Sequence, residues 1–284
     1  MAVVASLPVL LATLLVVPDP APQKSARDWT AEVRRVQARL PGPGFTVVAQ
    51  PPFVIAGDGT QDSVAAFASG TVRWAAERLH ADFFSRVPED PVTVWLFKDA
   101  KSYRRNALAL FGEAPSSPYG YFLSGESALV MNIATGGGTL VHEMVHAFMR
   151  ADFPDCPAWI NEGLASLFEQ CSDCSGHICG LPNWRLPGLV EAVRAGSLPS
   201  FRALASTTSA EFYGQDKGTN YAQARYLFLY LQERGLLRDF FRRVRDDHAA
   251  DPTGYASLVK VLDTVDMVGF QELWELWILT LRFR

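Results

Sequence analysis

The spacing of apolar residues divides the chain into a mixed first half and a helical second half. In the first half, short apolar runs typical of strands alternate with segments whose apolar residues recur at helical spacing. The predicted strands span residues 45–49, 53–56, 92–97, 119–123 and 128–133, and the predicted helices span residues 28–40, 62–86 and 100–110.

From residue 139 onward almost every segment has the period of an amphipathic helix. The predicted helices span residues 139–151, 158–170, 184–195, 219–234, 236–248, 254–262 and 268–283. The glycine run 136–138 lies at the junction of the halves and is interpreted as a flexible connection. We therefore predict an α+β fold with an N-terminal α+β subdomain over residues 23–138 and a C-terminal helical subdomain over residues 139–284.

The first residues form an uncharged apolar segment. Residues 1–17 carry no charged side chain, and a proline-rich stretch over residues 18–22 ends the segment. This length suits the apolar region of a signal peptide better than a membrane span, which needs about 20 residues. No Lys or Arg precedes the segment and no clear cleavage site follows it, so a retained anchor and a buried helix stay open. We predict export by residues 1–22, to a periplasmic, secreted or membrane-anchored location.

The composition and charge of the chain limit the classes of partner that the protein is expected to bind. The formal net charge of −4 and a pI of about 5.8 lack the basic footprint of a nucleic-acid-binding protein. Hydrophobic residues make up 49% of the chain and charged residues 20%, as in ordinary globular proteins. We therefore expect a monomer without a nucleic-acid partner, which contacts a membrane only if the N-terminal segment is retained.

Residues 142–146 read His-Glu-Met-Val-His. Two residues four positions apart lie on one face of a helix, so His142 and His146 can reach one metal ion. Glu143 then lies beside a metal-bound water without being a ligand. Zinc lowers the pKa of such a water, and a neighbouring glutamate can take its proton. Thr139 is a candidate N-cap for this helix.

A catalytic zinc of this kind needs a third protein ligand. Glu162 lies 16 residues after His146, an interval that allows one helix to end and a second to begin. A solvated helix position is the alternative, but burying an unpaired carboxylate among apolar neighbours is costly and ligation removes that cost. Ser166 and Glu169 lie on the same helical face; Glu169 either accepts a hydrogen bond from a ligand imidazole or is solvated.

The segments HEMVH and WINEGLA together resemble those of the gluzincin metallopeptidases, the group that contains thermolysin and the M1 aminopeptidases, and the form Asn-Glu-Gly-x-Ala is closest to M1-like and bacterial peptidase-MA-like domains. The resemblance is specific over residues 139–170 and extends in element order over about 45–245. It implies a zincin fold with a strand at the edge of the active site, one Zn²⁺ ion, and peptide-bond hydrolysis. It also implies His142, His146 and Glu162 as ligands and Glu143 as general base.

Two features depart from this pattern. The interval from histidine to glutamate is shorter than in thermolysin or typical M1 enzymes, which indicates a tighter connecting loop. The chain also lacks the Gly-x-Met-Glu-Asn segment that binds the substrate amino terminus in M1 enzymes. Aminopeptidase specificity is therefore not expected to carry over.

The resemblance also suggests residues around the cleft. A tyrosine on a later helix stabilises the oxyanion in M1-like families, and Tyr221 matches it; a core tyrosine is the alternative, with Tyr226 as a competitor. Arg225 and Gln223 are further candidates for the cleft wall. The strand over residues 128–133 is expected to form the edge that pairs with substrate backbone, with a simple internal strand as the alternative.

All four cysteines fall in one region, at Cys156, Cys171, Cys174 and Cys179. An exported protein favours two disulfides, whereas Cys171, Cys174, His177 and Cys179 could instead form a second, structural zinc site. The sequence does not choose among the three possible disulfide connectivities.

These observations predict a zinc metallopeptidase that acts on peptides or proteins. Two other functions stay open: a catalytically inactive binding module of peptidase shape, and a zinc amidohydrolase of non-peptide amides. The substrate and the choice between internal and terminal cleavage are not predicted.

Overall fold

The computed structural model of the protein describes residues 28–214 and 218–283. The segment predicted to direct export, residues 1–22, lies outside the described residues. In the described part of the chain, no helix combines the length and apolar character needed to cross a membrane.

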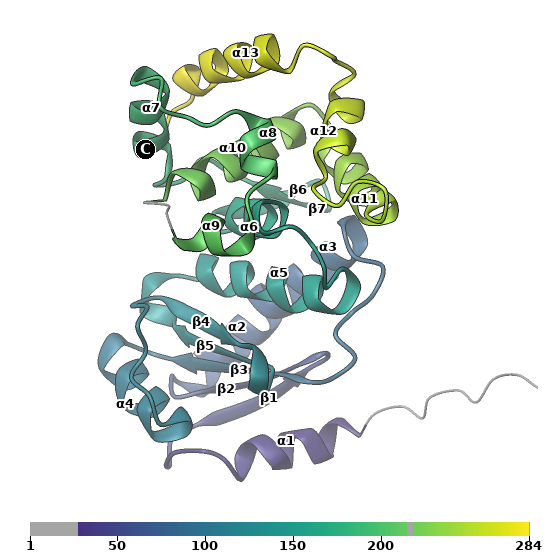
Figure 1. Ribbon diagram of the computed structural model, residues 1–284. Helices are drawn as coiled ribbons and strands as arrows, with labels where there is room; N and C mark the ends of the chain where they lie inside the picture. The colour runs from purple at the N-terminus through teal and green to yellow at the C-terminus, as the bar shows by residue number, and fades with distance from the viewer. Residues whose placement is uncertain (1–27, 215–217, 284) are drawn as a thin grey trace, which may run out of the picture.

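A five-stranded mixed sheet forms the lower half of the molecule in Figure 1. Its strands are β1 (Thr46–Gln50), β2 (Phe53–Gly57), β3 (Val92–Phe97), β4 (Gly120–Leu123) and β5 (Ala128–Asn132), in the order β1-β2-β3-β5-β4. β2, β3 and β5 are parallel, and both edge strands are antiparallel to their neighbours. The three parallel strands are buried along their whole length, as expected for strands covered on both faces.

The edge strand differs from the prediction. β5, predicted to form the edge, lies between β3 and β4, so the alternative of an internal strand is correct. The edge is β4, because β5 pairs in parallel with β3 on one side and forms an antiparallel pair with β4 on the other. The short 3-10 helix η2 (Ser124–Glu126) connects β4 to β5, and η3 (Ile133–Thr135) follows β5.

Different helices cover the two faces of the sheet. α1 (Trp29–Gln37) and α4 (Ala100–Phe111) pack on one face, where Val36, Trp95 and Tyr103 share an apolar cluster. The other face packs against α2 (Gln61–Phe67), a π-helical turn η1 (Ala68–Arg73), α3 (Trp74–Asp82) and α5 (Gly138–Asp152). The single helix predicted over residues 62–86 is therefore two α-helices joined by the π-helical turn.

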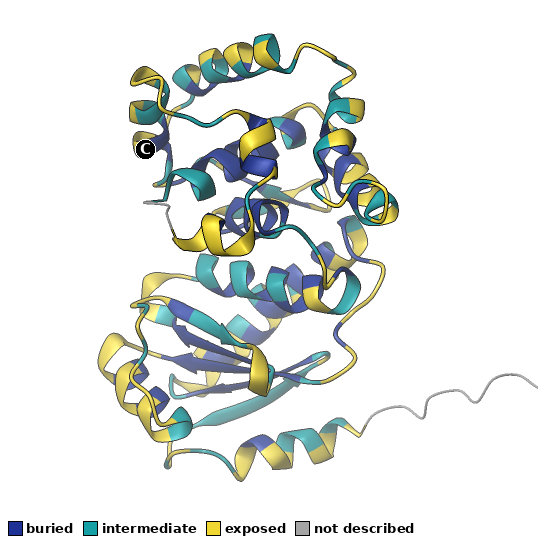
Figure 2. Ribbon diagram, in the orientation of Figure 1, coloured by how far each residue is buried: buried dark blue, intermediate teal, exposed yellow. Residues whose placement is uncertain are grey.

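The upper half of the molecule is mainly helical (Figure 1). It contains α6 (Ala158–Leu167), α7 (Leu186–Arg194), α8 (Phe201–Ala205), α9 (Ser209–Gly214), α10 (Thr219–Glu233), α11 (Leu237–Asp247), α12 (Tyr255–Leu262) and α13 (Met267–Thr280). α6 and α10 form the centre of this half and are buried over most of their length (Figure 2). The structure is thus of the mixed α+β class, as predicted.

One pair of strands interrupts the helical half and was not predicted. β6 (Cys171–Cys174) and β7 (His177–Gly180) form an antiparallel hairpin directly after α6. Its two turn residues, Ser175 and Gly176, have φ angles of 56° and 88°, the left-handed geometry that a two-residue hairpin turn requires. α6 consequently ends at Leu167 rather than at residue 170.

α5 lies between the sheet and the helical half (Figure 1). It contacts β4 and β5 on one side and α6 on the other. A single apolar cluster runs from Ile55 in the sheet through Val145 of α5 to Phe228 of α10. The two halves therefore share one core, and the glycine run near residue 138 marks a change in secondary structure.

Candidate metal centre

The helix that carries both histidines starts earlier than predicted. α5 begins at Gly138 with Gly137 at its N-cap, so Thr139 lies inside the helix and does not cap it. A Cβ atom at Gly138 would lie only 1.9 Å from the backbone carbonyl oxygen of Glu169. The glycine run is therefore not merely a flexible connection: at Gly138 it allows α5 to approach the chain just after α6, which only glycine permits.

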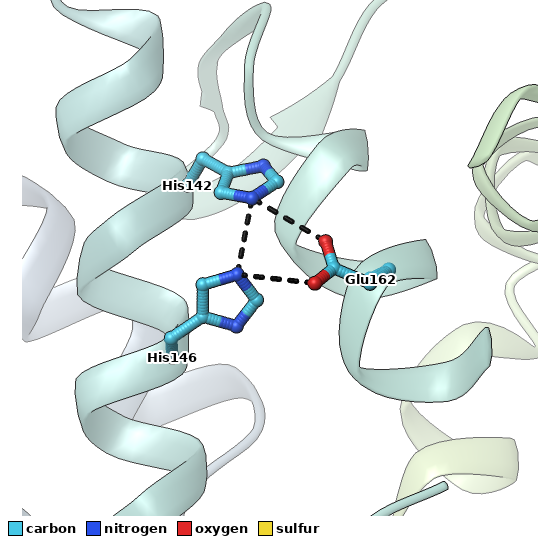
Figure 3. Close-up of side chains that lie close together, drawn as sticks. All are labelled: His142, His146 and Glu162. Atoms are coloured by element: carbon cyan, nitrogen blue, oxygen red, sulfur yellow. Dashed lines mark hydrogen bonds and ion pairs between the residues drawn. The ribbon is translucent and has the colours of Figure 1, made fainter. Parts of the chain in front are cut away.

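His142, His146 and Glu162 converge between α5 and α6 (Figure 3). The Nε2 atoms of the two histidines lie 3.0 Å apart. The Glu162 carboxylate lies opposite them, with Oε2 3.4 Å from Nε2 of His142 and Oε1 3.6 Å from Nε2 of His146. The structure thus brings together all three residues predicted as metal ligands, and this group could hold a metal ion.

The donor atoms fit a tetrahedral ion. Ligand atoms about 2.1 Å from such an ion lie about 3.4 Å from one another. The 3.0 Å between the two Nε2 atoms and the 3.4 Å from Nε2 of His142 to Oε2 of Glu162 are close to this value, while the second carboxylate oxygen, Oε1, faces His146. Oε2 of Glu162 is buried and has no hydrogen-bond donor, although the residue is only 5% exposed. A buried carboxylate oxygen without a partner is costly, and a bound cation removes that cost. In the described residues, no other group of histidine, cysteine and carboxylate side chains meets the same distance criterion.

Further side chains hold the imidazoles. Nδ1 of His146 lies 2.9 Å from Oδ1 of Asn161 and donates to it, which leaves Nε2 as the acceptor that faces the centre. Nδ1 of His142 lies 3.4 Å from Oε1 of Glu169. This contact is longer than a good hydrogen bond, so Nδ1 of His142 has no hydrogen-bond partner. The Glu169 carboxylate nevertheless faces Nδ1, which leaves Nε2 of His142 directed toward the centre. Ser166 instead donates to the backbone carbonyl of Glu162 in its own helix.

Residues of the segment that follows the hairpin hold the Glu169 carboxylate in place. Arg185 donates to both of its carboxylate oxygens, over 2.9 Å and 2.7 Å, and Asn183 donates to Oε2 over 3.0 Å. Burial raises the pKa of Glu169, but Arg185 and His142 outweigh burial and lower the pKa to about 2. Glu169 is thus a buried, ionised partner of a ligand imidazole rather than a solvated glutamate.

The electrostatics of the centre favour positive charge. Burial lowers the pKa of His142, but the close carboxylates of Glu162 and Glu169, each 3.4 Å away, and the nearby charge of Glu143 outweigh it and raise the pKa to about 10. Burial raises the pKa of Glu162, but the two imidazoles and the Tyr213 hydroxyl outweigh it and lower the pKa. Three carboxylates therefore stabilise a cation at this position.

No model of a protein family matches the sequence, and no curated protein matches it either. The chemistry of the site therefore rests on the residues themselves.

Two tyrosines lie at the centre, one of them not predicted. Tyr213 of α9 donates from its hydroxyl to Oε1 of Glu162 over 2.9 Å. Tyr221, the residue expected from the resemblance, lies at the start of α10 with its ring under the Arg185 guanidinium, 5.2 Å from the ring centre. The two rings lie 6.3 Å apart. The short helix α9 carried no apolar period, so nothing in the sequence pointed to Tyr213.

Three other candidates are parts of the core. Tyr226 is fully buried, and its hydroxyl donates to the backbone carbonyl of Asn183. Arg225 is fully buried and donates to the carbonyl oxygens of Leu167 and Leu181. Gln223 donates to the carbonyl of Pro199. Arg225 and Gln223 therefore do not line the cleft, because they face the interior of the helical half.

Two cavities open beside the centre. One has a volume of about 860 Å³ and extends past the glycine run and the end of α6. The other has a volume of about 470 Å³ and extends along Arg150 and Tyr213. His142, Glu143 and Tyr221 line both. The residue predicted as general base therefore lies where the two cavities meet.

All four cysteines are free thiols, so neither predicted disulfide is formed. Cys174 and Cys179 lie on one face of the hairpin and Cys171 on the other, because side chains alternate along a strand, while Cys156 precedes α6. Within residues 28–214 and 218–283, these cysteines and His177 also form no group close enough to share a metal ion.

Proposed function

We propose that this protein is a zinc-dependent peptidase of the gluzincin type with a zincin fold. The observation that carries the proposal is the convergence of two imidazoles and one carboxylate beside Glu143 at the meeting point of two cavities. Two histidines with one glutamate are a ligand set of catalytic zinc, which leaves a fourth position open for water or substrate.

When bound, zinc supplies a Lewis acid and a water of lowered pKa. Glu143 follows His142 on α5 and lines both cavities, so its carboxylate would be placed to accept a proton from the attacking water and to return it to the leaving amine. Tyr221 donates a hydrogen bond to the carbonyl oxygen as negative charge develops on it. Asn161 and Glu169 keep the two imidazoles in the orientation that ligation needs.

The geometry favours this function over an inactive binding module. Such a module is expected to lack a metal ligand, the general base or access to the site. Here, in contrast, His142 and Glu143 both line cavities of several hundred Å³. An amidohydrolase of non-peptide amides uses the same chemistry. A peptide substrate is supported by the edge strand β4, whose residues Gly120 and Tyr121 line the two cavities and can pair with an extended backbone.

The replacement Glu143→Gln tests the proposal. We expect one zinc per chain in both proteins, and hydrolysis of casein and of quenched peptides slower by about 10²- to 10⁴-fold in the variant, because the general base is lost. Glu272→Gln, an exposed position on α13, is the matched control and is expected to keep full activity. Zinc in the wild type without turnover on a broad peptide library would favour the binding module, and no bound zinc after reconstitution would overturn the proposal.

A further inference from the structure

Two cavities meet at the candidate metal centre, and together they are called the groove below. The larger and the smaller cavity share His142, Glu143 and Tyr221 and no other lining residue. A substrate whose reacting bond lies at Glu143 can therefore extend in both directions from that bond. A peptidase that removes terminal residues needs one direction closed, or a charged group that holds the chain end.

The charges of the groove do not provide such a group in the larger cavity. Apart from the catalytic residues, the charged side chains that line it are Glu169 and Arg185, and these bind one another. The smaller cavity adds Arg150, an exposed side chain that donates to the backbone carbonyl of Ser124. Among the residues that the structure describes, neither cavity thus offers a carboxylate for a substrate amino terminus beyond those of the metal centre, and Arg150 is the cation that could hold a carboxyl terminus.

An edge strand runs along both parts of the groove. Gly120 of β4 lines the larger cavity, and Tyr121 and Phe122 of the same strand line the smaller one. Among the described strands β4 pairs only with β5, so its other side faces away from the sheet. An extended polypeptide can add to such an edge across the whole length of the groove.

The larger cavity has an aromatic wall. Trp184, Tyr119 and Trp74 line it from three separate segments. Trp184 is 52% exposed and Tyr119 is 55% exposed, values that are unusual for rings of this size unless they serve a surface for binding. Because the charged pair Glu169 and Arg185 is neutral as a whole, this wall suits a large side chain without charge.

From these observations we infer that the protein is an endopeptidase: an extended polypeptide crosses both cavities, and the larger cavity takes a large apolar side chain near the bond that is cut. The inference rests on the proposed peptidase function and names its substrate class. It predicts cleavage within a chain whose two ends are both blocked.

A quenched peptide library with acetylated amino termini and amidated carboxyl termini tests this inference on the zinc-loaded full chain. We expect cleavage of blocked and unblocked peptides at similar rates, with cut sites located by mass spectrometry next to Phe, Trp, Tyr or Leu at one fixed position. Trp184→Ala is expected to lower kcat/KM by about 10-fold for a peptide with Phe at that position but not for its Ala counterpart. Tyr119→Ala, on a different segment, is expected to act in the same direction.

Leu276→Ala is the matched control, since Leu276 is an exposed apolar residue of α13 that lines neither cavity. Cleavage only of peptides with a free end would overturn the inference and leave the peptidase function intact. Equal losses on the Phe and Ala peptides in both cavity variants would overturn the apolar preference. A failure of the proposed function itself looks different, because wild type and Glu143→Gln would then be equally inactive on every peptide.

Discussion

The two tyrosines at the metal centre have different surroundings, and this separates their expected roles. The Tyr213 hydroxyl donates to Oε1 of Glu162, a candidate metal ligand, so Tyr213 fixes the position of the carboxylate. Tyr221 lines both cavities together with Glu143, where the proposed function expects the carbonyl of the substrate. The first role affects how tightly the metal is held and the second affects turnover.

Phenylalanine replacements distinguish the two roles. Tyr213→Phe is expected to weaken zinc affinity by about 10-fold or more, measured by competition with a chromogenic chelator, with turnover per bound zinc nearly unchanged. Tyr221→Phe is expected to keep zinc affinity and lower kcat by about 10²- to 10³-fold. The opposite pattern, zinc retained but turnover lost in Tyr213→Phe, would show that Tyr213 is the oxyanion donor.

The sequence was informative about the ligands but not about the groups that hold them. His142, Glu143 and His146 are related by helical geometry alone, and Glu162 belongs to a second local motif, so short-range spacing was enough. Tyr213 reaches Glu162 across 51 residues, and Arg185 reaches Glu169 across 16 residues with a hairpin between them. Such contacts depend on tertiary packing, which no local pattern encodes.

At the scale of elements, the position of Glu162 depends on the packing of α6 against α10. Gly163 faces the ring of Phe228, and a Cβ atom at Gly163 would lie 2.8 Å from that ring. The residue that follows the candidate ligand Glu162 is therefore packed tightly against α10.

Gly163→Ala is expected to destabilise the protein by about 1–3 kcal/mol, because the added methyl group overpacks a filled core. The free energy of unfolding is measured by urea denaturation. Gly188→Ala in α7 is the matched control: no atom lies within 4 Å of its Cβ position, and alanine is the better helix former, so stability should stay equal or rise by up to about 1 kcal/mol. A neutral Gly163→Ala would mean that α6 and α10 are less tightly packed than described.

Most elements could be predicted from apolar spacing, and the exceptions have physical causes. Each strand of the β6–β7 hairpin is only four residues long; β6 reads Cys-Ser-Asp-Cys and β7 reads His-Ile-Cys-Gly, so neither is long enough to show a clear apolar alternation. The order of the sheet was not predictable, because β4 and β5 have similar apolar runs and only the parallel pairing of β5 with β3 decides which one is the edge. α8 and α9 span fewer than two helical turns each.

At the scale of the whole molecule, an ion pair joins segments from both halves. Asp152 at the end of α5 accepts from Ser85, which follows α3, and from Arg245 of α11 over 2.8 Å. Its side chain is 1% exposed. Burial raises the pKa of Asp152, but the hydrogen bonds from Ser85 and Arg245 outweigh it and lower the pKa below its ordinary value of 3.8.

A carboxyl whose pKa is lower in the folded state stabilises the fold above its unfolded pKa, and this contribution disappears as pH falls through the folded pKa. Asp152→Asn is therefore expected to be less stable than wild type at pH 7 by about 1–3 kcal/mol. The difference should shrink once the pH falls below 3.8 and Asp152 becomes protonated. Urea unfolding at a series of pH values measures both curves, and a difference that is constant with pH would contradict the assignment.

The core shared through α5 has a consequence for how a substrate is received. Among the described residues, β4 and the helices of the upper half pack on the same helix, so one shared core holds the two walls of the groove together. If a polypeptide binds there as proposed, the conformational entropy lost on binding is expected to be mainly that of the substrate. Under the proposed function, a preorganised slot of this kind would discriminate by the disorder of its ligand: it would bind loops, tails and unfolded segments better than the same sequence held in a helix or a sheet.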